Sequence, residues 1–135
     1  MCLESVRLFP KRAKEDIIVC KKLAYHNGKL ITWYRDYPVT STIMRTKFIL
    51  FTIIKLLFEG RIHDRYMVGG GFIHSYSNTT SFYSKLGEFE GYTMYVKAVI
   101  PKGALYYKDY EGSTYASNIL ILKPSKEQLK YFKNK

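Results

Sequence analysis

Three runs of apolar, aromatic and β-branched residues fall in the second half of the chain, separated by glycine or proline. They occupy residues 69–76, 92–100 and 115–122. Runs of this kind are typical of consecutive β-strands. An earlier run at 17–24 leads into Asn27-Gly28, the preferred centre of a tight hairpin turn, and then into a returning strand at 29–34. The pattern predicts a twisted, mostly antiparallel sheet of about five or six strands.

The segment that begins at Ser41 and ends at Gly60 has the pattern of a helix. Four of its polar residues fall at offsets of 7, 3 and 4, which places them on one narrow face. These four residues are Arg45, Thr52, Lys55 and Glu59. Apart from Thr46 and Lys47 near the start, the rest of 43–58 is largely apolar. Ser41 can cap the start, and Gly60 can take the left-handed conformation at the end. We therefore expect one long core helix at about 42–59.

This helix should lie on the sheet and bury Ile49, Ile53 and Leu57. Its longest apolar stretch, at 48–58, is interrupted by Lys55. That stretch is far shorter than the roughly 20 residues needed to cross a bilayer. The sequence therefore predicts no membrane partner.

The length of 135 residues allows one domain, and we assign residues 1–135 to a single α+β domain. Residues 1–15 lack periodicity and are interpreted as an N-terminal arm. Residues 125–135 are basic, and Ser125 and Gln128 have capping-box spacing. A basic C-terminal helix and a frayed tail both fit that pattern. A further short helix is expected near 82–86.

The charge balance favours anionic partners. Lys and Arg number 22 against 11 Asp and Glu, which gives a formal net charge of +11. Such a surface suits nucleotides, nucleic acid, an acidic protein or a membrane surface, although a solvated basic surface needs no ligand. The 13 tyrosines can stack on a ligand ring or serve only as good strand formers. The oligomeric state stays open.

Metal and catalytic signatures are weak. The histidines fall in three separate elements, and neither cysteine has a second ligand at metal spacing. Ser75 follows His74, but neighbours in a strand point to opposite faces. We expect no catalytic residue, no metal and no cofactor, and we lean toward a protein that is not an enzyme. The cysteine usage and the absence of a signal-peptide pattern favour the cytoplasm.

A candidate ligand site follows the triple glycine at 69–71. Alternation places His74 and Tyr76 on one face of their strand. Tyr95 and Lys97 likewise share a face, opposite the apolar side that should pack on the helix. The remaining candidate ligand-binding residues are Ser75, Lys21, Arg35 and Tyr106. His74 could face a cleft or be a hydrogen-bonded core histidine, and both readings stay open.

The order of elements from about residue 17 to 122 resembles the ADP-ribosyltransferase-like fold. Residues 20–22 stand where that family carries Arg or His on its first strand, and Ser75 and Ser77 resemble its serine motif. Residues 96–103 are similar to its next strand and turn. The family's catalytic Glu has no counterpart at 115–118, which counts against transferase chemistry. A divergent ADP-ribosyltransferase remains one alternative.

The runs at 13–17, 71–75 and 100–107 together also resemble small accessory proteins of bacteriophages. Such proteins often counter host immunity. The resemblance implies a non-catalytic anti-defence protein that captures an anionic nucleotide, such as an immune signalling molecule, in the cytoplasm of the infected bacterium. The alternative is a basic inhibitor that binds a host immune protein such as a CRISPR nuclease.

Overall fold

The computed structural model describes most of the chain. The described residues are 3–5, 7–26, 28–32, 38–39, 41–46, 49–59, 61–62, 65–68, 72–87 and 89–133. Within them the strands form a ten-stranded sheet and a three-stranded sheet, and every strand pairing between named strands is antiparallel.

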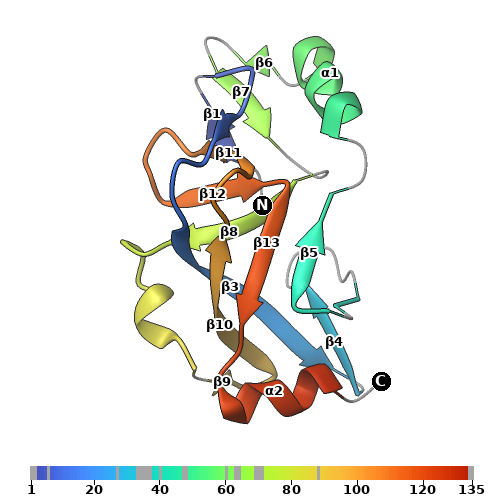
Figure 1. Cartoon of the computed structure of the whole chain (residues 1–135), viewed down its shortest axis with the longest axis vertical. Helices are drawn as coiled ribbons and strands as arrows, with labels where there is room; N and C mark the ends of the chain where they lie inside the picture. Colours follow the sequence, from blue (N-terminus) through green and yellow to red (C-terminus); the bar gives the residue numbers. More distant parts are fainter. Residues whose placement is uncertain are drawn as a thin grey trace.

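The centre of the large sheet is a long pair of strands, β3 (Ile17–His26) and β10 (Thr93–Ile100) (Figure 1). The other strands of this sheet are β2 (Lys11–Arg12), β4 (Lys29–Thr32), β5 (Ile43–Arg45), β8 (Ile73–Ser77), β9 (Phe89–Glu90), β11 (Leu105–Lys108), β12 (Thr114–Ser117) and β13 (Ile119–Lys123). Their order is β2-β11-β12-β8-β3-β10-β13-β5, with β4 also on β3 and β9 also on β10.

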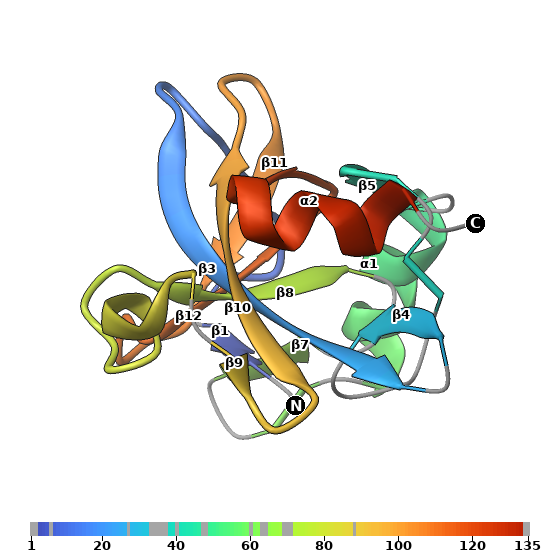
Figure 2. The same cartoon turned by 90° about the horizontal axis from the view of Figure 1, so that it is seen from below.

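Strand β3 pairs with a different neighbour at each end. Its first part lies beside β8, with Val19 opposite Ser77, and its last part lies beside β4, with Leu23 opposite Thr32. Because strands twist, a strand that changes partner along its length can turn the sheet through a large angle. Figure 2 shows β8 running across the long pair of β3 and β10. The expected hairpin between β3 and β4 is present, and Gly28 in its turn has a φ of 75°.

We call the face of the large sheet that carries Val19 and Leu23 the inner face. Their partners on β10 are Ala98 and Met94, and all four side chains are buried. Helix α2 (Lys126–Lys133) closes this core with Phe132 and lies at the lower end in Figure 1. The inner face therefore holds the main hydrophobic core.

The capping box of α2 forms as its sequence pattern predicts. The Gln128 backbone N–H donates to Ser125 Oγ (3.3 Å), and the Ser125 N–H donates to Gln128 Oε1 (3.0 Å). The Gln128 side-chain amide also donates to the backbone carbonyl of Tyr95 (2.8 Å). Of the two readings left open for this end of the chain, the helix is the one that forms.

The opposite, outer face is partly covered by two smaller units. One is the sheet of β1 (Leu3–Ser5), β7 (Arg65–Val68) and β6 (Arg61–Ile62). Its strand β1 belongs to the predicted N-terminal arm. Leu3 and Val68 form a second core with Tyr107 and Ala116 of the large sheet. The other unit is the segment around the 3-10 turn η1 (Tyr83–Lys85), close to the predicted short helix.

The prediction of one long core helix at 42–59 is wrong. Ile43–Arg45 form β5, which pairs with β13, and helix α1 (Ile49–Glu59) begins only afterwards. Met44 packs on the main core, whereas Ile43 and Arg45 are exposed. Periodicity alone does not distinguish so short an apolar stretch from the start of a helix. Leu57 is exposed and Ile53 only half-buried, and Figure 1 shows α1 at the upper end of the molecule.

The predicted number of about five or six strands is also wrong, although the antiparallel pairing agrees with the prediction. The additional strands include β2, β6 and β9, of two residues each. Strands so short carry no alternating pattern, and only their partners define them. No described helix is long and apolar enough to cross a membrane.

Candidate functional site

Tyr76 and Tyr95 lie on the outer face, where they stack on Phe82 rather than on an open surface. The ring centroid of Phe82 lies 4.3 Å from that of Tyr76 and 5.9 Å from that of Tyr95, with interplanar angles of 28° and 20°. The amino groups of Lys22 and Lys85 each lie within 6.0 Å of the Phe82 ring. The segment that carries Phe82 therefore covers the two tyrosines that the sequence analysis assigned to ligand stacking.

The ring of His74 contacts backbone carbonyl groups on both sides of the triple glycine in the sequence. Its Nε2 lies 3.0 Å from the carbonyl oxygen of Val68, and its Nδ1 lies 3.2 Å from that of Phe72. Burial is the main cause that lowers the pKa of this imidazole. A neutral imidazole can donate from only one of these nitrogens. The described contacts thus correspond to the hydrogen-bonded alternative and leave His74 no outward-facing nitrogen.

The other predicted residues divide between the two faces. Lys97 is exposed on the outer face, directly opposite Lys123 of β13. Lys21, Ser75 and Tyr106 lie on the inner face. Arg35 lies outside the described residues. The structure therefore does not gather the predicted residues into one site, but it does bring Lys21 and Ser75 together.

Four neighbouring strands contribute one residue each to a row across the inner face, which we call the inner row. Ser75 of β8 lies opposite Tyr115 of β12, and Tyr115 lies opposite Lys108 of β11. The register of β3 with β8 places Cys20 opposite Tyr76, so Lys21 is next to Ser75. Residues directly opposite in an antiparallel pair point to the same face. The inner row therefore reads Lys21, Ser75, Tyr115, Lys108.

The Lys21 side chain enters the inner face instead of solvent. Its Nζ donates a 2.6 Å hydrogen bond to the backbone carbonyl of His74. Burial lowers the pKa of Lys21 from 10.5 to about 8. At neutral pH the amine is therefore still mainly charged, with a single described hydrogen bond for its three donors.

The hydroxyl of Ser75, the neighbour of Lys21 in the inner row, is buried without a partner in the described part of the structure. Ser75 is 3% exposed, and its Oγ has no hydrogen bond within the described part of the structure. A buried polar atom that stays unpaired costs about 1–3 kcal/mol, and most such atoms in proteins are paired. Within the inner row this hydroxyl is therefore a donor that a polar ligand could satisfy.

Tyrosine rings and exposed lysines continue the site toward the edge of the sheet. The rings of Tyr115 and Tyr106 are half-buried, with centroids 5.9 Å apart. Lys108 Nζ lies 5.6 Å from the Tyr115 ring centroid, and Lys11 lies opposite Tyr106 across the β2–β11 pair. Four strands separated by about 4.8 Å each give the row a length of about 14 Å.

The chemistry of the inner row is cationic, aromatic and hydroxylic. None of its four residues is acidic, and no group of His, Cys, Asp or Glu suited to a metal occurs in the described residues. Glu111, the acid nearest in sequence to residues 115–118, is exposed in the turn before β12, where its backbone N–H donates to Asp109 Oδ2. The row is thus suited to holding an anion and a ring.

Tyr115 and Lys108 are the members of this row that the sequence analysis did not select. Alternation within β11 and β12 could place each on a face, but only the register between the strands shows that both lie beside Ser75. Comparisons of the chain with protein-family models, with curated proteins and with solved structures found no match.

Proposed function

We propose that this protein binds an anionic, ring-bearing ligand of the nucleotide type on the inner row and does not convert it chemically. The observation that carries this proposal is the pair formed by the buried amine of Lys21 and the unpaired hydroxyl of Ser75. Each of these groups would donate a hydrogen bond to the same phosphate, either to one shared oxygen atom or to two different ones.

The phosphate end of the ligand would lie at Lys21. A charged hydrogen bond to phosphate is shorter and stronger than one between neutral groups, and it gains further strength where water is excluded. The ammonium form is favoured below its pKa of about 8, so the amine is available as a cation at neutral pH. Ser75 would supply a second donor beside it.

The ring of the ligand would lie over Tyr115, with Tyr106 beside it. Stacking of a base on an aromatic side chain contributes about 1–3 kcal/mol and tolerates different bases. Lys108 and Lys11, both exposed, would contribute positive charge around a second phosphate. A row of about 14 Å would accommodate a dinucleotide as well as a mononucleotide.

Binding without conversion agrees with the absence of a carboxylate among the row's four residues. Capture of an anionic nucleotide is also what the resemblance to small bacteriophage accessory proteins implies. The protein would then act by sequestering an immune signalling nucleotide of the host. Sequestration would be effective only where the concentration of the protein at least equals that of its ligand.

Calorimetric titration with nucleoside monophosphates, linear dinucleotides and cyclic dinucleotides tests the proposal. Lys108→Met should weaken the binding of whichever probe binds by about tenfold or more, since a charged hydrogen bond contributes about 1.5–3 kcal/mol. Lys97→Met is the matched control, because Lys97 is also an exposed lysine but lies on the outer face. Ser75→Ala should weaken binding without lowering the melting temperature, because its hydroxyl has no partner to lose.

Equal losses in Lys108→Met and Lys97→Met would show that the probes bind only to the general positive charge. No binding of any probe by the folded wild-type protein would also contradict the proposal. Release of a modified or cleaved nucleotide during the titration would refute the claim that the ligand is not converted.

A further inference from the structure

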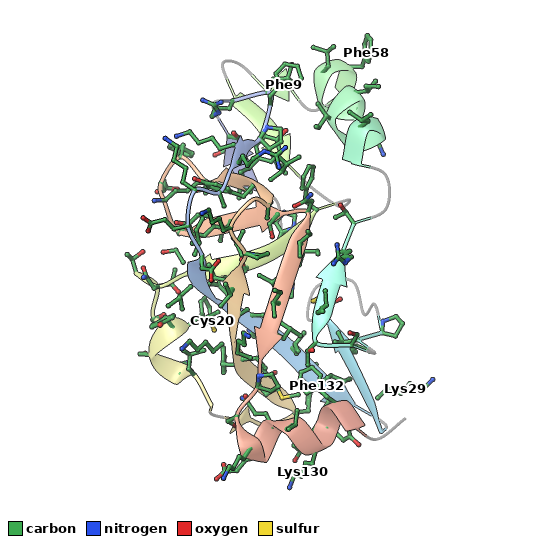
Figure 3. The ribbon with its side chains drawn as sticks, in the orientation of Figure 1. Phe9, Cys20, Lys29, Phe58, Lys130 and Phe132 are labelled. Carbon is green, nitrogen blue, oxygen red and sulfur yellow. The ribbon has the colours of Figure 1, made fainter. Side chains whose placement is uncertain are left out.

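The outward face of α1 is an exposed apolar surface. Leu50, Ile54, Leu57 and Phe58 are separated by 4, 3 and 1 residues, which places them on one side of the helix. Their exposed fractions are 73%, 53%, 51% and 78%. Phe9, which is 63% exposed, lies at the same end of the molecule as Phe58 in Figure 3. We call these five residues the apolar end.

One flank of the exposed apolar face holds α1 on the rest of the protein, because Ile53 lies three residues after Leu50 and four before Leu57 and so borders that face. Ile53 packs against the second core, which includes Leu3 and Val68. The helix is therefore attached along the Ile53 edge, while the neighbouring side chains of Leu50, Ile54 and Leu57 stay exposed. Contiguous exposed apolar side chains of this kind mark an interaction surface more often than chance exposure does.

Exposed cations flank the apolar end. Lys55 lies on α1 itself, and Arg7 lies beside Phe9, whose carbonyl accepts a 3.3 Å hydrogen bond from the Arg7 guanidinium. The whole chain carries a formal net charge of +11. Such charge repels a second copy of the same chain and attracts an anionic surface.

We propose that the apolar end docks on the surface of a bilayer that contains anionic lipid headgroups. The apolar side chains project from a helix at one end of the molecule, and fluid acyl chains adapt to such a convex shape whereas a protein partner must supply a groove. Leucine and phenylalanine would enter the boundary between headgroups and acyl chains, while the flanking cations meet the headgroups. The helix would lie on the membrane, so the absence of a membrane-crossing segment does not oppose this contact.

Sedimentation with lipid vesicles tests this docking. Wild-type protein should pellet with vesicles of phosphatidylcholine and phosphatidylglycerol at low salt, and much less with pure phosphatidylcholine. The double variant Ile54→Glu/Phe58→Glu should bind the anionic vesicles about tenfold or more weakly, because the insertion of two apolar side chains is lost. Its melting temperature should stay close to wild type, since both residues are exposed.

The control variant is Tyr92→Glu, combined with Lys97→Gln to match the change of two charge units. Both residues are exposed and lie on β10 or the turn before it, away from α1. Near wild-type vesicle binding by this control, together with the loss in the double variant, supports insertion of the apolar end. Equal losses in the two variants would show attraction by net charge alone and overturn the proposal. Absence of vesicle binding, with a wild-type dimer that the double variant converts to a monomer, would identify a second copy as the occupant and overturn it too.

Discussion

The Nζ atom of Lys21 lies 2.6 Å from the backbone carbonyl oxygen of His74, the residue whose ring contacts both ends of the triple-glycine segment. The buried amine of Lys21 therefore contacts β8, the strand that positions Ser75. The His74 ring in turn contacts the backbone on both sides of residues 69–71. Burial disfavours the charged form of this amine, so its presence in the fold has a cost in stability at neutral pH. Methionine, of similar length and without charge, removes that cost.

Lys21→Met should have a more favourable effect on the free energy of unfolding at pH 7 than at pH 10. The folded pKa of about 8 lies below the ordinary value of 10.5, so between these values the unfolded chain binds the proton that the native state has released. Stability due to Lys21 therefore rises with pH across that window. The stability gain of the variant over wild type should fall by roughly 2–3 kcal/mol from pH 7 to pH 10.

Urea denaturation of both proteins at the two pH values measures this difference. Cys20 and Tyr107 also titrate abnormally at alkaline pH, but they are present in both proteins, so their effects cancel in the comparison. A stability difference that is the same at pH 7 and pH 10 would mean that Lys21 is solvated in the native state.

His74→Ala should lower stability and leave the inner row intact. The substitution removes ring contacts to the carbonyls of Val68 and Phe72, and a lost hydrogen bond of this kind costs about 1–3 kcal/mol. The pKa of His74 is lowered, so its contribution to stability is present above pH 6.5 and declines as the pH falls below that value. Thermal melting at pH 7.5 and pH 5.5 checks both effects.

His74→Gln is the control for this prediction, because glutamine can still donate to a carbonyl but does not titrate. It should lose less stability than wild type when the pH falls from 7.5 to 5.5. An unchanged melting temperature in His74→Ala at pH 7.5 would show that the ring contacts contribute nothing.

Cys20 should react slowly with iodoacetamide in the native protein. Its thiol is buried under Phe82, and burial raises its pKa from 9.0 to about 11. Because the thiolate is the reactive form, alkylation at pH 9 should be roughly fiftyfold or more slower than in urea. The protonated thiol favours the native state below pH 9, and this contribution is lost as the pH rises toward 11.

Peptide mass spectrometry after timed alkylation would report on Cys20 alone. Phe82→Ala should speed the reaction, since it removes the ring that lies between Tyr76 and Tyr95 and opens the outer face there. Equal rates in native and urea-treated protein would indicate that the segment around Phe82 does not cover the thiol.

Gln128→Ala should detach α2 from the core. The variant loses the buried hydrogen bond to the Tyr95 carbonyl and half of the capping box, with an expected cost of about 1–3 kcal/mol. Glu127→Ala is the control, because Glu127 is the exposed neighbour on the same helix. Denaturant unfolding should give a clear loss for the first variant and little for the second.

Ile53→Asp should destabilise the protein much less than Leu120→Asp. Ile53 is only half-buried against the second core, whereas Leu120 is 0% exposed in the main core. An unpaired charge in a fully buried position is among the most destabilising changes known, and a half-buried aspartate can turn toward water. Thermal melting of both variants tests which core dominates stability.

The sequence was a good guide to elements whose pattern is local and long. Alternation over eight residues defines β10, and Asn-Gly marks the hairpin after β3, because both signals lie within one segment. Ser125 and Gln128 likewise contain the whole capping signal of α2. Each of these features could be predicted without knowledge of any partner strand.

Features that depend on a partner distant in the sequence could not be predicted from local patterns. The run at Ile43–Arg45 is a strand because β13 lies beside it, and nothing in the run itself separates this from the start of a helix. Tyr76 and Tyr95 were assigned to a ligand, but Phe82 occupies the space between them. The inner row likewise follows from the registers of three strand pairs, which an isolated sequence does not specify.

The path of strands through the large sheet ends at β2 on one side and at β5 on the other. Open strand edges can template pairing with another chain and so begin aggregation, but short edges with charged residues discourage it. Strand β2 consists only of exposed Lys11 and Arg12, and the three-residue β5 ends in exposed Arg45. A protein that works by stoichiometric capture must accumulate to the level of its ligand. Short, cationic edge strands would allow the protein to reach such concentrations without forming fibres.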